Sequence, residues 1–146
     1  MTTQESVIAE ARALLGVRFA HQGRHAQHGL DCLGLLLVVA ERAGVHFNGT
    51  MPKELDMRQY GTRPDAAMLK AKLDQWLLPR DGDAQTGDVL LLDIQSEPQH
   101  LALVSDYPVE GDVGMIHAYA PARKVVEHRY DAVWKKATRA IYQLPN

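Results

Sequence analysis

The spacing of apolar residues changes near the middle of the chain. In the first 80 residues, three segments repeat apolar positions every three or four residues, which predicts helices within 2–16, 32–43 and 65–79. Beyond residue 82, short apolar runs separated by turn residues predict antiparallel strands. These runs are 88–94, 100–106, 114–120, 124–130 and 138–144. Helices followed by a strand meander favour an α+β fold, with N-terminal helices packed on a sheet of four or five mostly antiparallel strands.

Capping residues mark the ends of the first two helices. Thr2 and Glu5 form a capping box, and Gly16 stands where a left-handed cap would end the first helix. Asp31 is the expected N-cap of the second helix, and Gly44 is its C-terminal stop. The second helix is apolar nearly all round, so we expect it to lie buried at the centre of the fold.

Two segments lack any apolar period and are predicted to be irregular. Residues 17–30 are rich in glycine and histidine and lead into the second helix. Residues 45–64 are interrupted by glycines and prolines, and we expect them to form one wall of a cleft beside that helix. Asp65 should then cap the third helix, and Pro79 should close it.

Composition limits the classes of function. The chain has 146 residues, 46% of them hydrophobic, which fits one domain spanning 1–146. A formal charge of −2 gives no basic surface for nucleic acid. The longest apolar run, 35–40, is too short to span a bilayer, and the first 20 residues lack a secretory signal pattern. We therefore expect cytoplasmic synthesis without membrane insertion.

The only cysteine, Cys32, is predicted to begin the buried second helix. Backbone N–H groups and the helix dipole at that position favour a thiolate, and the same N–H groups can stabilise an oxyanion. Gly34 would keep side-chain bulk away from an incoming substrate. A lone cysteine beside an apolar run is also often a small buried hydrophobe, so its position alone leaves both interpretations open.

Two histidines on neighbouring predicted strands are candidates for the partners of a cysteine nucleophile. His100 opens one strand and His117 lies inside the next. A hairpin register that pairs His100 with Tyr119, or with His117 itself, would place both histidines on one face of the sheet. His100 would then be the general base toward Cys32, and His117 would hold the tautomer of His100.

Four motifs occur in the order and spacing of the NlpC/P60 cysteine peptidases, a family that the chain resembles: "GLDCLGLL", "TGDVLLLDI", "QHLALVSD" and "MIHAYAPARKVVEHRYD". The resemblance implies a papain-like α+β fold with Cys32, His100 and His117 as catalytic residues and no cofactor. It implies hydrolysis of an amide in the peptidoglycan stem peptide, typically between D-γ-glutamate and diaminopimelate. Asp31, besides capping the helix, would lie near the free amine of the substrate, and Gly34 would border the substrate site.

Within that family, the chain is most similar to small phage-type members that are associated with tails. These carry an apolar residue after the cysteine, as Leu33 does here, where secreted members usually carry serine. The likeness implies delivery by a phage tail or gene-transfer particle. Its tail proteins would be the partners, and the enzyme would act in the cell wall.

Two alternatives use other features of the chain. A zinc-binding module is one, because four potential ligands lie within twelve residues: His21, His25, His28 and Cys32. A non-catalytic adaptor in a tail assembly is the other, although an adaptor needs no nucleophile and base. His128 is a further candidate for the histidine site, and His46 has no assigned role.

Overall fold

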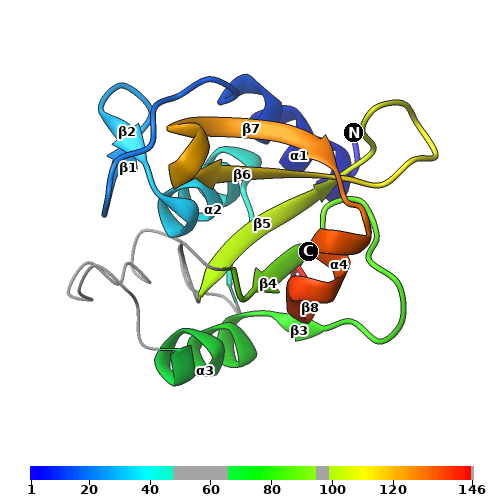
Figure 1. The fold of residues 1–146 in the computed structure, drawn as a ribbon. Helices are drawn as coiled ribbons and strands as arrows, with labels where there is room; N and C mark the ends of the chain where they lie inside the picture. Colours follow the sequence, from blue (N-terminus) through cyan, green and yellow to red (C-terminus); the bar gives the residue numbers. More distant parts are fainter. Residues whose placement is uncertain (48–65, 95–98, 146) are drawn as a thin grey trace.

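The computed structural model describes residues 1–47, 66–94 and 99–145, which form helices on both faces of a twisted antiparallel sheet (Figure 1). The helices in this part of the chain are α1 (Thr3–Ala13), α2 (Cys32–Ala43), α3 (Ala66–Trp76), α4 (Ala132–Ala137) and a 3-10 turn, η2 (Ala120–Ala122). The strands are β1 (Arg24–His25), β2 (Gly29–Leu30), β3 (Leu78–Pro79), β4 (Val89–Leu92), β5 (His100–Ser105), β6 (Gly114–Tyr119), β7 (Lys124–Arg129) and β8 (Thr138–Gln143).

The main sheet has the order β3-β8-β4-β5-β6-β7, and all its strand pairs are antiparallel. Strands β4 to β7 form a meander, and β8 returns to pair with β4 on the opposite side from β5. The five predicted strands are confirmed. The two-residue β3 joins them at the edge beyond β8, a position that tolerates Pro79 because an edge strand needs fewer N–H donors.

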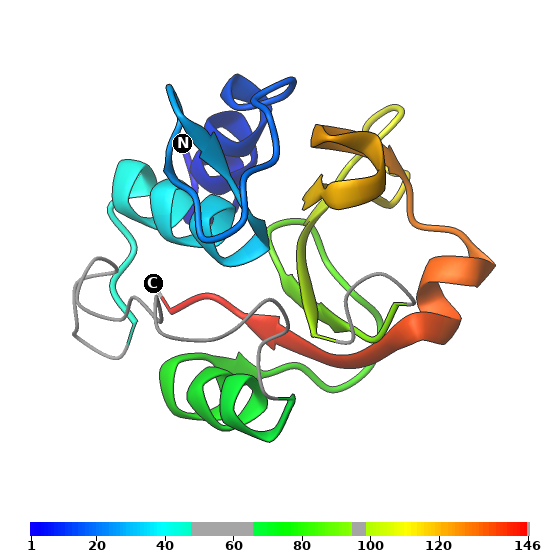
Figure 2. The same ribbon diagram turned by 60° about the vertical axis from the view of Figure 1, so that its left-hand side comes forward.

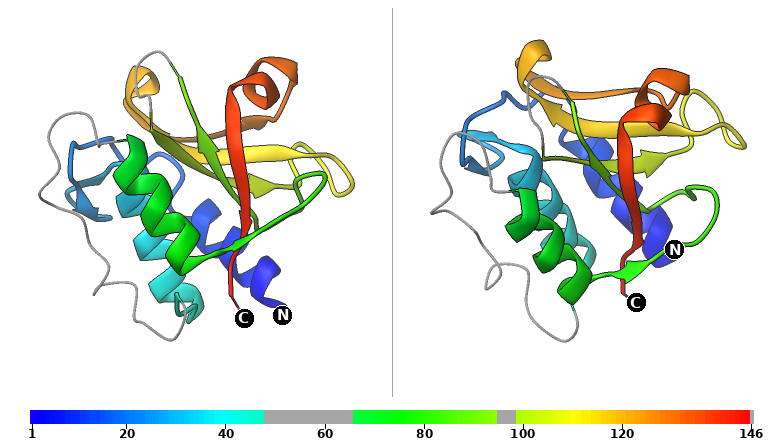
Figure 3. Two further views of the ribbon diagram at one scale, coloured as in Figure 1. Left: turned by 90° about the horizontal axis from the view of Figure 1, so that it is seen from below. Right: turned by 60° about the horizontal axis from the view of Figure 1, so that its bottom comes forward.

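The two faces of the sheet are covered differently. Helices α1, α2 and α3 lie together on one side, whereas α4 lies on the other (Figures 2 and 3). Alternation along β5 divides its side chains between two apolar clusters: Leu101 and Leu103 join the large cluster with α1 to α3, while Ala102 and Val104 join the smaller one. Helix α2 is buried along most of its length, as its all-round apolar pattern predicts. No helix in the described part of the chain is long and apolar enough to cross a bilayer.

The predicted caps of the first two helices are mostly confirmed. Thr2 Oγ1 accepts from the Glu5 N–H at 3.1 Å, and the Glu5 carboxylate accepts from the Thr2 N–H at 2.9 Å. Asp31 caps α2, and Gly44 ends it with a φ of 73°. Gly16 has the predicted left-handed conformation, with a φ of 86°, but it lies beyond the cap itself, because α1 ends at Ala13 with Leu14 as C-cap. The chain then turns through tight i to i+3 bonds, and the Gly16 N–H donates to a β7 carbonyl instead.

The two segments predicted to be irregular have different outcomes. Residues 17–30, predicted to be irregular, contain the short hairpin of β1 and β2. The predicted cap Asp65 and the greater part of the predicted connection, residues 48–64, lie outside the described residues. Helix α4 was not predicted, because its six residues are too few to show a period.

A buried ion pair fixes the entry to β4 and explains the glycine and aspartate at that point. Asp88 is 4% exposed and accepts from Arg80 Nε at 2.5 Å, from Arg80 Nη2 at 3.1 Å and from the Gln85 N–H at 2.9 Å. Gly87 has a φ of 91°, and a Cβ there would lie 2.9 Å from the Gln4 side chain of α1. The motif therefore allows α1 to approach the turn closely while Asp88 holds the turn and Arg80 together.

Replacing Asp88 by asparagine should lower the free energy of unfolding by about 2–3 kcal/mol, since the buried charge pair with Arg80 is broken and one acceptor is lost. Urea unfolding monitored by circular dichroism measures the change. The exposed Asp81→Asn is the control and should stay within about 0.5 kcal/mol of wild type. Equal stability of both variants would show that the Asp88 pair does not hold the turn.

Candidate active site

Cys32 is the first residue of α2, and its side chain is 7% exposed. Helix α2 packs against β5 and β6. The cysteine lines a small cavity with residues of its own helix and of β4 and β5, namely Leu35, Leu36, Val89, Leu101, Ala102 and Leu103. Its thiol therefore lies beside the beginning of β5, the strand that His100 opens.

A buried carboxylate holds the start of α2 in place. Asp31 Oδ1 accepts from the Gly34 N–H at 2.7 Å and from Arg24 Nη1 at 2.8 Å, and Oδ2 accepts from the Gln22 N–H at 3.0 Å. The side chains of Asp31 and Arg24 are only 6% and 5% exposed. The aspartate thus ties the β1–β2 hairpin to the helix that carries Cys32. Contact between Asp31 and a substrate amine stays a prediction.

Gly34 is required by the packing of the chain itself. A Cβ at this position would lie 2.0 Å from the carbonyl oxygen of Gly23, closer than any real contact allows. The hairpin backbone therefore rests directly on the first turn of α2, and it occupies the space that was expected to admit a substrate. A contact between Gly34 and substrate stays a prediction, but the need for glycine has this packing explanation.

The predicted histidines lie where β5 and β6 separate. Their ladder pairs Leu103–Ser105 with residues 114–116 only, and its register extends to place His100 opposite Tyr119. This is one of the two predicted registers. On their other edges, His100 pairs with Leu92 of β4 and His117 pairs with Val126 of β7. Both histidines therefore lie beyond the last β5–β6 ladder pair, Leu103 with Ile116.

The structure brings His100 and His117 together and adds a third histidine. His100 Nε2 lies 2.6 Å from His117 Nδ1, and both residues are fully buried. His117 Nε2 lies 2.8 Å from Nε2 of His128, whose Nδ1 lies 2.9 Å from the carbonyl oxygen of Arg129. The sequence had offered His128 only as a further candidate, and the β6–β7 register of the structure places it diagonal to His117 on the same face.

Aromatic side chains enclose this row of histidines. The Tyr119 ring stacks on His117 with centroids 4.8 Å apart, and Trp134 meets His117 edge-on at 5.2 Å. Trp134 also lies 5.0 Å from His128. It comes from α4, whose N-cap Asp131 accepts from the Trp134 N–H. Helix α4 thus places an aromatic cover over the row.

Burial determines the charge state of the central histidine. Loss of hydration, and secondarily the neighbouring His100 and His128, lower the pKa of His117 from 6.5 to about 2. His117 is therefore neutral at physiological pH. A neutral imidazole donates one hydrogen bond and accepts another, so His117 can orient His100 but does not carry positive charge itself.

The residues proposed as zinc ligands do not converge. His25 and His28 meet edge to face with centroids 5.9 Å apart on the β1–β2 hairpin. Throughout residues 1–47, 66–94 and 99–145, no group of three or more histidine, cysteine, aspartate or glutamate side chains is arranged to hold a metal. The geometry therefore gives no support to the zinc alternative. His46, without an assigned role, is exposed after α2.

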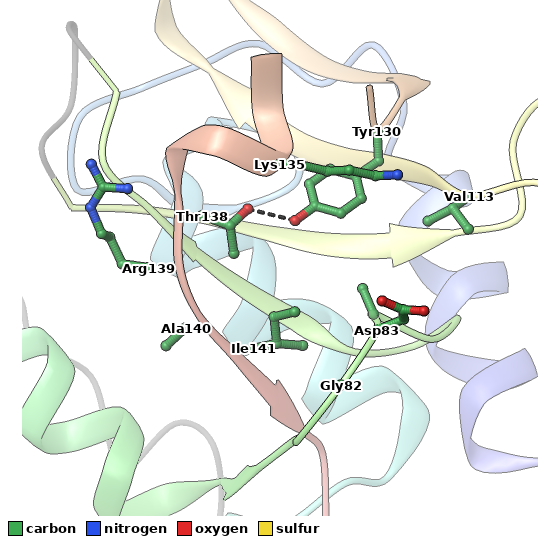
Figure 4. Close-up of a pocket in the computed structure, with 10 residues that line it drawn as sticks. Gly82, Asp83, Val113, Tyr130, Lys135, Thr138, Arg139, Ala140 and Ile141 are labelled. Atoms are coloured by element: carbon green, nitrogen blue, oxygen red, sulfur yellow. Dashed lines mark hydrogen bonds between the residues drawn. The ribbon is translucent and has the colours of Figure 1, made fainter. Parts of the chain in front are cut away.

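A larger pocket lies elsewhere and lacks the chemistry expected of a reaction site. It measures about 510 Å³ and is bounded by the turn before β4, by α4 and by β8 (Figure 4). The Thr138 hydroxyl is hydrogen-bonded to Tyr130, and no cysteine or histidine lines the pocket. The histidine row, which begins at His100 next to the β5 residues that line a cavity with Cys32, is therefore the stronger candidate for catalysis.

Comparison with protein families matches residues 16–143 to the model of the NlpC/P60 family. No curated protein matches the chain significantly. Among solved structures, the NlpC/P60 domain of the peptidoglycan hydrolase SagA has a TM-score of 0.57 and 21% identity, with 96% of this chain and 97% of that one covered.

Two further structures share the fold but belong to longer chains. RipB, a peptidoglycan hydrolase from Mycobacterium tuberculosis, has a TM-score of 0.57 and 19% identity over 99% of this chain and 66% of its own. An NlpC/P60 family protein from Bacillus cereus has a TM-score of 0.63 and 17% identity over 97% of this chain and 40% of its own. The present chain thus spans less than two thirds of either protein.

The neutral state of His117 predicts acid sensitivity. Below pH 6.5 an unfolded chain would protonate this histidine while the folded chain does not, so the free energy of unfolding should fall as the pH falls. Between pH 6.5 and 4.5, this residue should contribute about 2 kcal/mol of that fall. Urea unfolding at several pH values should therefore give a shallower pH dependence for His117→Gln than for wild type. Identical slopes would contradict the assignment.

Proposed function

Because the chain belongs to the NlpC/P60 family, we propose that it is a cysteine peptidase that hydrolyses amide bonds of the peptidoglycan stem peptide. The observation that carries this proposal is the buried hydrogen bond between His100 and His117, on a strand whose following residues line a cavity with Cys32 at the start of α2. Solved relatives described as peptidoglycan hydrolases share the fold, which supports the choice of substrate class.

The reaction assigned to these residues has two stages. The thiol of Cys32 gives its proton to Nδ1 of His100, and the thiolate attacks the amide carbonyl carbon. First-turn N–H groups of α2, that of Cys32 included, stabilise the resulting oxyanion. His100 then protonates the leaving amine, so the C–N bond breaks and a thioester remains. Water deprotonated by His100 hydrolyses the thioester and restores the thiol, without a cofactor.

His117 acts on His100 rather than on the substrate. Its Nδ1 accepts the His100 Nε2–H, which keeps the ring from rotating and stabilises the imidazolium formed when Cys32 loses its proton. Because burial keeps His117 neutral, it supplies an acceptor for that bond throughout the reaction. Tyr119, stacked on His117, restricts the ring further.

The finer substrate and setting extend the same proposal. The bond cleaved is the one between D-γ-glutamate and diaminopimelate, and the enzyme acts in the cell wall as part of a phage or phage-like tail, with tail proteins as partners. The support is the motif around Cys32: Leu33, where secreted members usually carry serine, is 2% exposed and packs in the core. A buried leucine at this position fits the tail-associated type that the motif resembles.

Activity should depend on Cys32 and His100 but not on the hairpin histidines. On the tripeptide L-alanyl-D-γ-glutamyl-diaminopimelate, Cys32→Ser and His100→Ala should each lower the rate at least about a thousandfold, since nucleophile and base act as a unit. The exposed His25→Ala, a control that also removes one supposed zinc ligand, should keep wild-type activity. Activity retained by Cys32→Ser would refute the peptidase assignment.

Thiol reactivity tests the same pair without a substrate. Alkylation of Cys32 by iodoacetamide should proceed at pH values well below ~8.5, the pKa of a free thiol. His100→Ala should remove this low-pH reactivity. The metal content of the sample is measured in parallel. A slow thiol with stoichiometric zinc would favour the metal site, and a slow thiol without metal would favour an adaptor.

The products formed from intact peptidoglycan identify the bond. Mass spectrometry of digested sacculi should show fragments that begin with a free diaminopimelate amine. Fragments cut between muramic acid and L-alanine would indicate an amidase instead, an activity named for a Bacteroides uniformis protein of similar fold, 11% identical with a TM-score of 0.54. The proposed association with a tail is tested separately: the chain should be found in purified tail particles, and its absence from them would contradict this association.

A further inference from the structure

The row of histidines does not end at His117, and its last member is anchored to the backbone. His128 Nδ1 lies 2.9 Å from the carbonyl oxygen of Arg129. A carbonyl oxygen only accepts hydrogen bonds, so Nδ1 of His128 carries the proton. In the neutral ring, Nε2 of His128 is then a lone-pair acceptor, and it faces His117 Nε2 at 2.8 Å.

This anchor determines the direction of every other hydrogen bond in the row. His117 must donate to His128 through Nε2–H, which leaves Nδ1 of His117 as an acceptor. His100 must therefore donate to His117 through Nε2–H over 2.6 Å. The lone pair of His100 is consequently placed on Nδ1, the nitrogen that takes the proton of Cys32 in the proposed reaction.

We propose that His128 is a positioning residue: it fixes the tautomers of His117 and His100 and so keeps the basic nitrogen of His100 available to Cys32. The inference rests on the proposed function, because it concerns the base of that reaction. During turnover only His100 exchanges a proton with Cys32, the leaving amine and water. His100 gains and later releases a proton at Nδ1, while His117 and His128 keep theirs.

The location of His128 fits a positioning role better than a packing role. It is half-buried on β7, an edge strand of the sheet, whereas His100 and His117 are fully buried. Its ring is hydrogen-bonded to His117 and has ring contacts with His117 and Trp134. Its replacement by a side chain without an acceptor should therefore remove the partner on which the buried Nε2–H of His117 depends, at a cost in stability that urea unfolding measures.

Two substitutions separate the acceptor from the ring. His128→Phe keeps an aromatic ring against Trp134 but has no acceptor, whereas His128→Gln can present an amide oxygen near the position of Nε2. On the peptide substrate, His128→Phe should lower kcat about tenfold or more with KM nearly unchanged, and His128→Gln should restore most of it. The exposed His25→Phe is the matched control and should match wild type.

Two further measurements require no substrate. The ¹⁵N NMR signals of the imidazoles in the wild-type chain should show the proton on Nδ1 of His128 and on Nε2 of His100 and His117. The pH profile of Cys32 alkylation should shift toward the ~8.5 of a free thiol in His128→Phe but not in His128→Gln. Urea unfolding of each variant verifies that it folds.

The outcomes distinguish the two proposals. If the tautomers and alkylation shifts are as expected but peptidoglycan is not hydrolysed, the proposed substrate is wrong and the role of His128 is supported. A wild-type proton on Nε2 of His128 would overturn the positioning role, even if His128→Phe did not fold. Wild-type kcat and a wild-type alkylation profile in a folded His128→Phe would overturn it as well.

Discussion

The candidate site depends on one requirement: the buried imidazole rings of His100 and His117 need hydrogen-bond partners inside the protein. Each ring nitrogen of His100 and His117 is polar, and a buried polar atom without a partner is costly. The row of hydrogen bonds to the Arg129 carbonyl supplies partners along its length. The rings lie beyond the end of the β5–β6 ladder, and Trp134 of α4 lies against His117.

A second buried polar group plays the corresponding part on the helix side. Asp31 ties together three segments: the first turn of α2, the Gln22 backbone and the Arg24 side chain. The close approach of Gly23 to Gly34 locks the hairpin onto the helix. Both the thiol and the histidine row are thus held by chain segments whose own positions are fixed by buried hydrogen bonds. Such a site is largely preorganised, as catalysis by a nucleophile and base requires.

Sequence reasoning succeeded where one local signal determines the structure. The Asp31 cap, the Gly44 stop and the strands marked by short apolar runs follow from side-chain chemistry and spacing, and the structure contains them. It failed where the determining partner is distant. Beyond α1 the Gly16 N–H donates to a β7 carbonyl, and ahead of the β1–β2 hairpin the Gln22 N–H donates to Asp31. The place of His128 in the row required the β6–β7 register, which the chain sets only after folding.

The order of strands also has a consequence for how the chain reaches its native state. Strand β8 comes last among the strands yet pairs with β4, so β4 has only one neighbour until some forty-five further residues have been made. Until then an apolar strand presents unpaired N–H and C=O groups to any other extended chain. Pairings between strands so far apart in sequence form slowly. A nascent chain is therefore most prone to aggregate before β8 pairs with β4. The residues that cover this edge of β4 are synthesised after the whole histidine row.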